Sequence, residues 1–131
     1  MFEPSCIFLD KKAYQNNISL LKNYVGDDVL FSAVMKGNAY GHGINYLLPM
    51  AEECGIHHFS VFSADEALRA VKASNGESSV MIMGMITNEQ LEWAIQHDIE
   101  FYIFDVDRLE AAIKMANQQH KKARIHLQLE T

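Results

Sequence analysis

The chain has 131 residues, 49% of them hydrophobic, and a formal net charge of −6 at pH 7. This composition suffices for a buried core and excludes a disordered chain, and the length indicates one domain. The negative net charge argues against a nucleic-acid-binding surface. Because we find neither a long apolar run nor a basic N-terminal region before an apolar stretch, we expect no membrane span and no signal peptide. Cys6 and Cys54 fit no metal or disulfide-rich spacing, so we expect a cytoplasmic protein without a metal site.

The N-terminal part predicts a short strand followed by a helix. Ser5 to Leu9 is a short apolar run that we interpret as a strand. Asp10 can cap the following helix, because its carboxylate can accept a hydrogen bond from the first turn. One apolar stripe at helical spacing follows, formed by Tyr14, Ile18, Leu21 and Val25.

The stretch from Val29 to Gly43 organises the chain. Val29 to Met35 is a continuous apolar run, which predicts a strand buried on both faces. Lys36 then stands at the carboxyl end of that strand, where α/β folds place their chemistry. In a dry site such an amine can lose its proton and attack a carbonyl carbon. The alternative is that Lys36 only ends the strand and points into water.

Four further strands follow, each separated from the previous one by a predicted helix. The predicted strands are His58 to Phe62, Ser79 to Met83, Phe101 to Phe104 and Arg124 to Leu129. Short apolar strands that alternate with helices indicate βαβ units and a parallel sheet. The pattern alone allows a doubly wound sheet or a (β/α)₈ barrel. Since no G-x-G-x-x-G follows a strand, a dinucleotide-binding fold has no support.

Helix-start and helix-end residues separate these units. The first helix after Lys36 should end at Gly55, and Pro49 predicts a kink or a late start in it. Two capping boxes open the next helices, at residues 63–66 and 87–90, in which a hydroxyl and a side-chain oxygen each satisfy a backbone donor. Asp105 should cap the last helix, and Asp107 beside it should be solvated. Three apolar helix faces are predicted: Ala64, Ala67, Leu68 and Val71; Leu91, Ala94 and Ile95; Val106, Leu109, Ile113 and Ala116.

Residues 36–43, KGNAYGHG, resemble the lysine motif of the alanine racemase family, usually written KANAYGHG, at seven of eight positions. The exception is Gly37, where alanine is usual. The resemblance implies pyridoxal 5′-phosphate (PLP) held by Lys36 as a Schiff base, with Tyr40 contacting the cofactor phosphate. It also favours the barrel: an α/β fold of the (β/α)₈ TIM-barrel type, present here as its first five strands with their helices.

The resemblance further implies a domain layout and an assembly. Residues 1–131 would be the N-terminal part of the PLP-binding barrel, and the strand within residues 1–9 would belong to a C-terminal β domain outside this chain. The second catalytic residue, a tyrosine from a partner subunit, would also lie outside it. An open half-barrel exposes its edge strands and an apolar sheet face, so we expect a homodimer or a higher homo-oligomer.

The implied function is amino-acid racemisation. Lys36 would exchange the Cα proton on one face of an aldimine, and the partner tyrosine would do so on the other. The substrate would be a small amino acid: alanine first, then serine or a broader range. Decarboxylases and PLP-carrier proteins also place a lysine after the first barrel strand, but they lack the N-A-Y-G-H-G continuation. The alternative of another class is a non-catalytic fragment that self-associates and at most binds PLP.

Five other residues invite a functional interpretation. Asn38 fits a turn residue that bonds the local backbone better than a substrate contact. We assign His42 no catalytic role, because it could orient the loop or simply be exposed. His57 and His58 stand at the entrance of a predicted strand, where adjacent residues point to opposite faces, which argues against a shared metal. Gln128 stands where many alanine racemases carry a carbamylated lysine, which weakens the inference of a strict preference for alanine.

Overall fold

A computed structural model describes residues 5–26 and 28–129 of the chain. Its helices are α1 (Lys11–Val25), α2 (Lys36–Tyr40), α3 (Ile44–Glu53), α4 (Ala64–Ala73), α5 (Asn88–Gln96) and α6 (Val106–Gln118). Its strands are β1 (Ala33–Val34), β2 (His58–Val61), β3 (Ser79–Ile82), β4 (Glu100–Ile103) and β5 (Ile125–Leu127). The predicted alternation of strands and helices is therefore confirmed.

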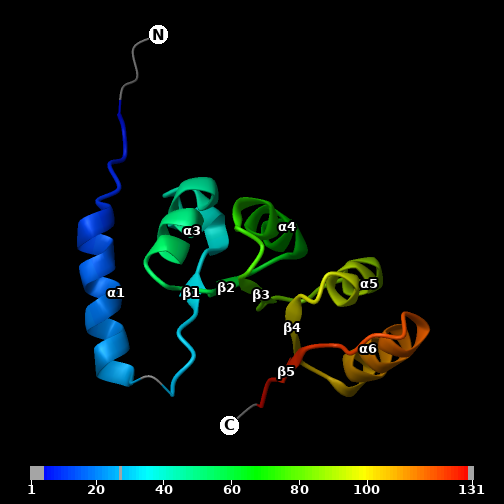
Figure 1. Cartoon of the computed structure of the whole chain (residues 1–131). Helices are drawn as coiled ribbons and strands as arrows, with labels where there is room; N and C mark the ends of the chain where they lie inside the picture. The colour runs from blue at the N-terminus through cyan, green and yellow to red at the C-terminus, as the bar shows by residue number, and fades with distance from the viewer. Residues whose placement is uncertain (1–4, 27, 130–131) are drawn as a thin grey trace.

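The strands form one parallel sheet in which each strand pairs with the next along the chain, in the order β1-β2-β3-β4-β5. Figure 1 shows α3, α4, α5 and α6 following one another around the outside of the curved row of strands, with α1 standing beside β1. A doubly wound sheet would reverse its strand order at a switch point. Across the described strands the order runs in one direction, which confirms the predicted partial (β/α)₈ barrel.

The helix ends form largely as the sequence predicts. The Asp10 and Asp105 carboxylates accept hydrogen bonds from the backbone N–H groups of Ala13 and Arg108, at 2.9 and 2.7 Å. The capping box at residues 87–90 is complete in both directions. At the end of α3, the N–H groups of Gly55 and Ile56 donate back to the carbonyls of residues 52 and 51, the Schellman arrangement, with Gly55 at a positive φ of 81°.

Pro49 lies inside α3 and does not delay its start. The helix begins at Ile44 and runs through Pro49 to Glu53. Asn38 lies upstream and accepts from the Ile44 N–H, at 3.0 Å, so the helix is already capped before the proline. The prediction of a late start was therefore wrong, because a contact from outside the helix stabilises its first turn.

The first strand is shorter and less buried than its sequence predicts. The predicted strand from Val29 to Met35 is reduced to the two residues of β1, and Val29 and Leu30 are exposed. Of this run only Met35 is fully buried. The physical reason is that β1 is an edge strand among the described residues: it pairs with β2 on one side only, so no neighbouring strand extends its ladder or covers its outer flank.

Ser5 to Leu9 is not a strand within the described chain, contrary to the local pattern. Phe8 in this segment is 90% exposed. A strand needs a neighbour for its backbone hydrogen bonds, and the described residues provide none at this position. The apolar stripe of α1 is also only partly used: Ile18 is buried and Tyr14 half-buried, whereas Leu21 and Val25 are exposed.

The core lies between the sheet and the helices that cover it. The strands contribute large side chains, including Phe59, Ile82 and Phe101, each fully buried. The helices meet them mainly through small residues, namely Ala51, Ala67, Ala70, Ala94, Ala112 and Ala116. Small helix residues let the helix axes approach the sheet closely, so larger residues at the margins stay outside. This explains why Val106 and Ile113, predicted to face inward on α6, are exposed.

Candidate functional site

Lys36 lies at the carboxyl edge of the sheet, directly after β1. The last ladder bond of this strand runs from the Met35 N–H to the carbonyl of Ser60 on β2, at 2.7 Å. Lys36 follows it and is half-buried. The carboxyl ends of all five parallel strands share this edge, which is the edge that carries active sites in β/α barrels. The prediction that Lys36 ends a parallel strand is confirmed.

The chain leaves β1 through a left-handed turn, α2. Gly37, Asn38, Ala39 and Tyr40 have φ values of 61°, 55°, 55° and 52°. For an L-residue this conformation costs roughly 1–2 kcal/mol, so a run of them persists only where other contacts hold it. Gly37, the position at which the sequence departs from the family motif, adopts this conformation without a Cβ penalty.

Hydrogen bonds inside the loop hold part of this turn. The Ala39 N–H donates to the Met35 carbonyl at 2.8 Å, and the Gly43 N–H donates to the Asn38 carbonyl at 2.9 Å. The Asn38 side chain accepts from the first N–H of α3, which confirms that it bonds the local backbone. His42 is exposed, with Nδ1 2.8 Å from the Ala39 carbonyl, so it orients the loop and also faces solvent.

Tyr40, predicted to contact a cofactor phosphate, is 64% exposed. It closes the left-handed turn that Lys36 opens, so α2 contains both predicted site residues. The side chain of Tyr40 is not part of the core and is available to a ligand. Its exposure argues against the alternative in which the aromatic ring serves only for packing.

Glu66 joins this turn to the neighbouring strand, which sequence reasoning missed. The Ser63 hydroxyl accepts from the Glu66 N–H at 3.3 Å, as a capping box requires. The Glu66 carboxylate, however, does not return to Ser63. Its Oε2 accepts from the Phe62 N–H at 2.8 Å, and its Oε1 accepts from the Gly37 N–H at 2.7 Å. The predicted capping box is therefore only half formed, because a tertiary partner takes the carboxylate.

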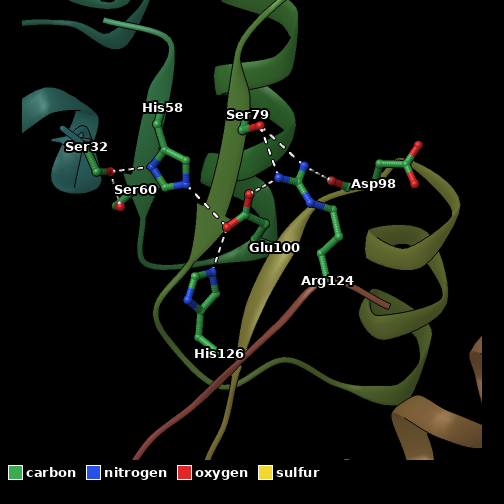
Figure 2. A network of polar contacts seen from close by, with 8 residues as sticks. All are labelled: Ser32, His58, Ser60, Ser79, Asp98, Glu100, Arg124 and His126. Carbon is green, nitrogen blue, oxygen red and sulfur yellow. Dashed lines mark hydrogen bonds and ion pairs between the residues drawn. The ribbon is translucent and has the colours of Figure 1, made fainter. Parts of the chain in front are cut away.

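A polar network covers the face of the sheet opposite the helices, near the amino ends of the strands (Figure 2). His58 Nδ1 lies 2.7 Å from the Ser32 hydroxyl, which lies 2.6 Å from the Ser60 hydroxyl. Oε2 of Glu100 lies 3.3 Å from Nε2 of His58 and 2.6 Å from Nε2 of His126. One buried carboxylate oxygen thus connects histidines from β2 and β5.

The second Glu100 oxygen forms an ion pair with Arg124, whose guanidinium also donates to the Ser79 hydroxyl at 3.3 Å. Burial alone would raise the pKa of Glu100, but the hydrogen bonds from His126 and His58 and the Arg124 charge outweigh it and hold that pKa below its ordinary value. The sequence predicted an apolar inner face for the open half-barrel. That prediction was wrong at this end of the sheet.

The sequence signal that could have revealed this network is the alternation of polar and apolar residues along the strands. Residues two apart on a strand share one face, so His58 and Ser60 point together while Phe59 between them faces the helices. Glu100 and His126 also share this face, because Tyr102 pairs with His126 and Glu100 lies two positions before Tyr102 on β4. Strand pairing and register are needed before these alternations can be combined into one cluster.

Neither a metal site nor a membrane-spanning helix is found in the residues that the structure describes. No three His, Cys, Asp or Glu side chains there are arranged to hold a metal ion. None of the described helices is both long and apolar enough to cross a bilayer. His58, the first residue of β2, is buried in the network, whereas His57 precedes the strand and is exposed.

Comparison with known proteins gives the family. The family model for the alanine racemase N-terminal domain matches residues 9–131. The chain belongs to the alanine racemase family. This match includes α1, all five strands and the turn after Lys36.

Relatives and solved structures of the family extend well beyond this chain. Alanine racemase 1 of Caldanaerobacter subterraneus subsp. tengcongensis is 30% identical over 95% of this chain, which covers 31% of that protein. Alanine racemase from Bacillus anthracis with bound L-Ala-P has a TM-score of 0.78 at 26% identity, over 93% of this chain and 33% of that one. Histidine racemase from Leuconostoc mesenteroides subsp. sake shares the fold, with a TM-score of 0.76 at 18% identity, over 88% of this chain and 30% of that one. The chain thus spans about a third of the length of these proteins.

We predict that Gly37→Ala destabilises the chain although the added Cβ meets no atom within 4 Å. The left-handed φ of 61° penalises alanine, and the smaller entropy of the unfolded chain offsets only part of this, leaving a net loss of about 1 kcal/mol. Urea unfolding measures the loss. Gly37→Asn is the matched control, because asparagine tolerates this conformation and should lose less. A stability of Gly37→Ala equal to or above that of the unsubstituted chain would contradict the prediction.

We predict that Glu100→Gln lowers the free energy of unfolding at pH 7 by about 1–3 kcal/mol, because a buried charged acceptor loses its partners. Since the folded pKa of Glu100 lies below its ordinary value, its contribution is complete at neutral pH and is lost as the pH falls through the carboxyl range, below about pH 5. The variant should therefore lose less stability on acidification. Asp98→Asn, an exposed carboxylate beside the network, is the control and should change stability by less than about 0.5 kcal/mol. Parallel pH-stability curves for Glu100→Gln and the unsubstituted chain would refute the assignment.

Proposed function

We propose that this chain provides the lysine-bearing part of a PLP-dependent amino-acid racemase. The observation that carries the proposal is the position of Lys36: half-buried, at the carboxyl end of the first barrel strand, and followed by a left-handed turn in a chain that matches the family over residues 9–131. We further propose alanine as the first candidate substrate, since the relatives reported above include alanine racemases.

The residues present fit PLP. The group needs an amine for its aldehyde and donors for its phosphate, and the turn offers the Lys36 amine together with the exposed Tyr40 hydroxyl. Lys36 would hold the cofactor covalently, and Tyr40 would donate a hydrogen bond to its phosphate. When bound, PLP supplies an electron sink that stabilises a carbanion at the substrate Cα.

Within this scheme Lys36 moves a proton at Nζ. Once released from the cofactor, its amine would take or return the Cα proton on one face of the substrate. Inversion requires a second acid–base group on the opposite face, and we propose that it comes from a part of the full-length protein beyond these residues. The whole activity is thus a property of a longer protein, which agrees with the coverage of about a third of the relatives' length.

Which amino acid is the substrate depends on side chains of the active site, of which this chain contains only a part. Gln128 follows β5 at the carboxyl edge, is exposed, and donates its backbone N–H to the Ile103 carbonyl at 3.1 Å. It cannot form the carbamate that the resemblance associates with this position. Serine or a broader set of amino acids therefore remains the second candidate, and the histidine racemase of the same fold shows that this architecture occurs with another named substrate.

We propose that the chain assembles with further protein through its open sides. Ile7 and Phe8 are exposed on a segment that is not a strand in the described chain, which supports pairing of the predicted strand within residues 1–9 with a β domain outside this chain. Residues 1–4 of that predicted strand lie outside the described residues. Leu127 and Val34 are exposed on the two edge strands, which supports a homodimer or a higher homo-oligomer.

The free thiols of Cys6 and Cys54 support a cytoplasmic location. The alternative is that the chain by itself is a non-catalytic module that self-associates and at most binds PLP.

We predict that PLP followed by borohydride labels Lys36 selectively, because its amine combines partial burial with a preorganised turn. Peptide mapping should find the phosphopyridoxyl group on Lys36 at roughly tenfold higher occupancy than on exposed lysines such as Lys12. Lys36→Arg, which keeps the charge and removes the reactive amine, should abolish this selective label. Equal labelling of Lys36 and the exposed lysines would favour the alternative of a non-catalytic fragment.

We predict that Tyr40→Phe weakens PLP binding by about ten- to a hundredfold, the effect of losing one hydrogen bond to a charged group. Equilibrium titration of the cofactor absorbance measures the affinity. Tyr46→Phe removes a hydroxyl from another exposed tyrosine, on α3, and should leave the affinity unchanged. If both variants bind PLP like the unsubstituted chain, Tyr40 does not contact the phosphate.

A further inference from the structure

We propose that Glu66 is a positioning residue for Lys36: its carboxylate clamps the left-handed turn that follows the lysine to the carboxyl end of β2. The inference concerns a residue that makes no assumed contact with substrate or cofactor, and it rests on the proposed function only for its consequence at Lys36. The clamp itself is a statement about two hydrogen bonds, from the N–H groups of Gly37 and Phe62.

The need for the clamp arises where β1 and β2 separate. In a pair of parallel strands, the N–H of a residue donates to the carbonyl of one residue on the neighbouring strand. The carbonyl of the same residue accepts from the N–H of the residue two positions further along that neighbouring strand. Met35 donates to the Ser60 carbonyl, so a continuing ladder would direct the Phe62 N–H to the Met35 carbonyl. That carbonyl instead accepts from Ala39 within the turn, at 2.8 Å. The turn therefore leaves the Phe62 N–H without its ladder partner.

The turn also leaves a second donor at its own start. The first N–H groups of a helical turn have no partner within it, and here the N–H of Gly37, in the peptide that follows Lys36, is one of them. Two backbone donors thus converge at the splitting point of two strands. A carboxylate matches them, because it offers two acceptor oxygens and no donor.

Glu66 supplies this carboxylate from the first turn of α4. Oε1 accepts from Gly37 at 2.7 Å and Oε2 accepts from Phe62 at 2.8 Å, which are charge-assisted lengths. Ser63 caps the Glu66 backbone N–H, so the residue that makes the clamp is itself fixed. Fixing the Lys36–Gly37 peptide fixes the direction in which the Lys36 side chain leaves the strand.

Two substitutions in the first turn of α4 distinguish the loss of the clamp from the general effect of removing a negative charge there. Glu66→Ala removes both acceptors, whereas Asp65→Ala removes an exposed carboxylate from the same first turn of α4. Glu66→Gln retains one acceptor oxygen and presents an NH₂ group to the other donor, so it should behave as an intermediate. None of the three substitutions removes the Ser63 hydroxyl or the backbone N–H of residue 66, so we expect the Ser63 cap to persist in all of them.

The first measurement is hydrogen exchange of single backbone amides in the 131-residue chain. Glu66→Ala should speed exchange at Gly37 and Phe62 by roughly tenfold relative to Asp65→Ala, because one charge-assisted hydrogen bond is lost at each amide. Unchanged exchange at both amides would overturn the proposal, since the carboxylate would then not hold the turn.

The second measurement is selective labelling of Lys36 by PLP and borohydride, which a merely structural role would leave unchanged. Labelling should fall about fivefold in Glu66→Ala, less in Glu66→Gln, and remain unchanged in Asp65→Ala at matched thermal stability. Faster exchange with undiminished labelling would reduce Glu66 to a structural residue and overturn its positioning role. If the unsubstituted chain itself shows no selective label, the proposed function fails, and the amide rates then decide alone whether Glu66 holds the turn.

Discussion

The Met35 carbonyl decides how the first strand ends. It accepts from the Ala39 N–H and so belongs to the left-handed turn instead of the β1–β2 ladder. Three features of the carboxyl edge follow from this hydrogen bond. The β1–β2 ladder stops at Ser60, and Lys36 leaves the sheet where the two strands separate. Two backbone N–H groups then need another acceptor, which is the Glu66 carboxylate. The strain of three non-glycine residues at positive φ is thereby held by contacts from α3 and α4.

The two faces of the sheet serve different purposes. The outer face is apolar and closely covered, because alanines on the helices allow large strand residues such as Phe59 and Phe101 to fill the space. The inner face near the amino ends carries a polar network centred on Glu100, in which the donors come from other strands. In β/α barrels the chemistry lies at the carboxyl ends and the opposite end serves stability. The arrangement of Lys36 and Glu100 at opposite ends of the strands agrees with this division.

The accuracy of prediction depended on how far apart the interacting residues are in the chain. Asp10, Thr87 and Asp105 cap helices as expected, because a cap and its donor lie within one turn. The position of Lys36 after a parallel strand was also predictable, since strand pattern and motif both lie in one short stretch, although the predicted burial of that strand was wrong. Glu66 was assigned to a capping box because its local spacing fits one, but a donor 29 positions away takes its carboxylate.

The sequence by itself determined the alternation of strands and helices, the family motif and the residues that cap α1, α4, α5 and α6, because these depend on short-range periodicity and local hydrogen bonding. Only the tertiary structure decided how the strands' polar residues combine, which helix residues face the sheet, and how short β1 is. Those features depend on register and on neighbours far along the chain: Glu100 meets His58 across 42 positions. No local pattern contains such a partner, so the inner network and the clamp on the Lys36 turn become visible only once the sheet is assembled.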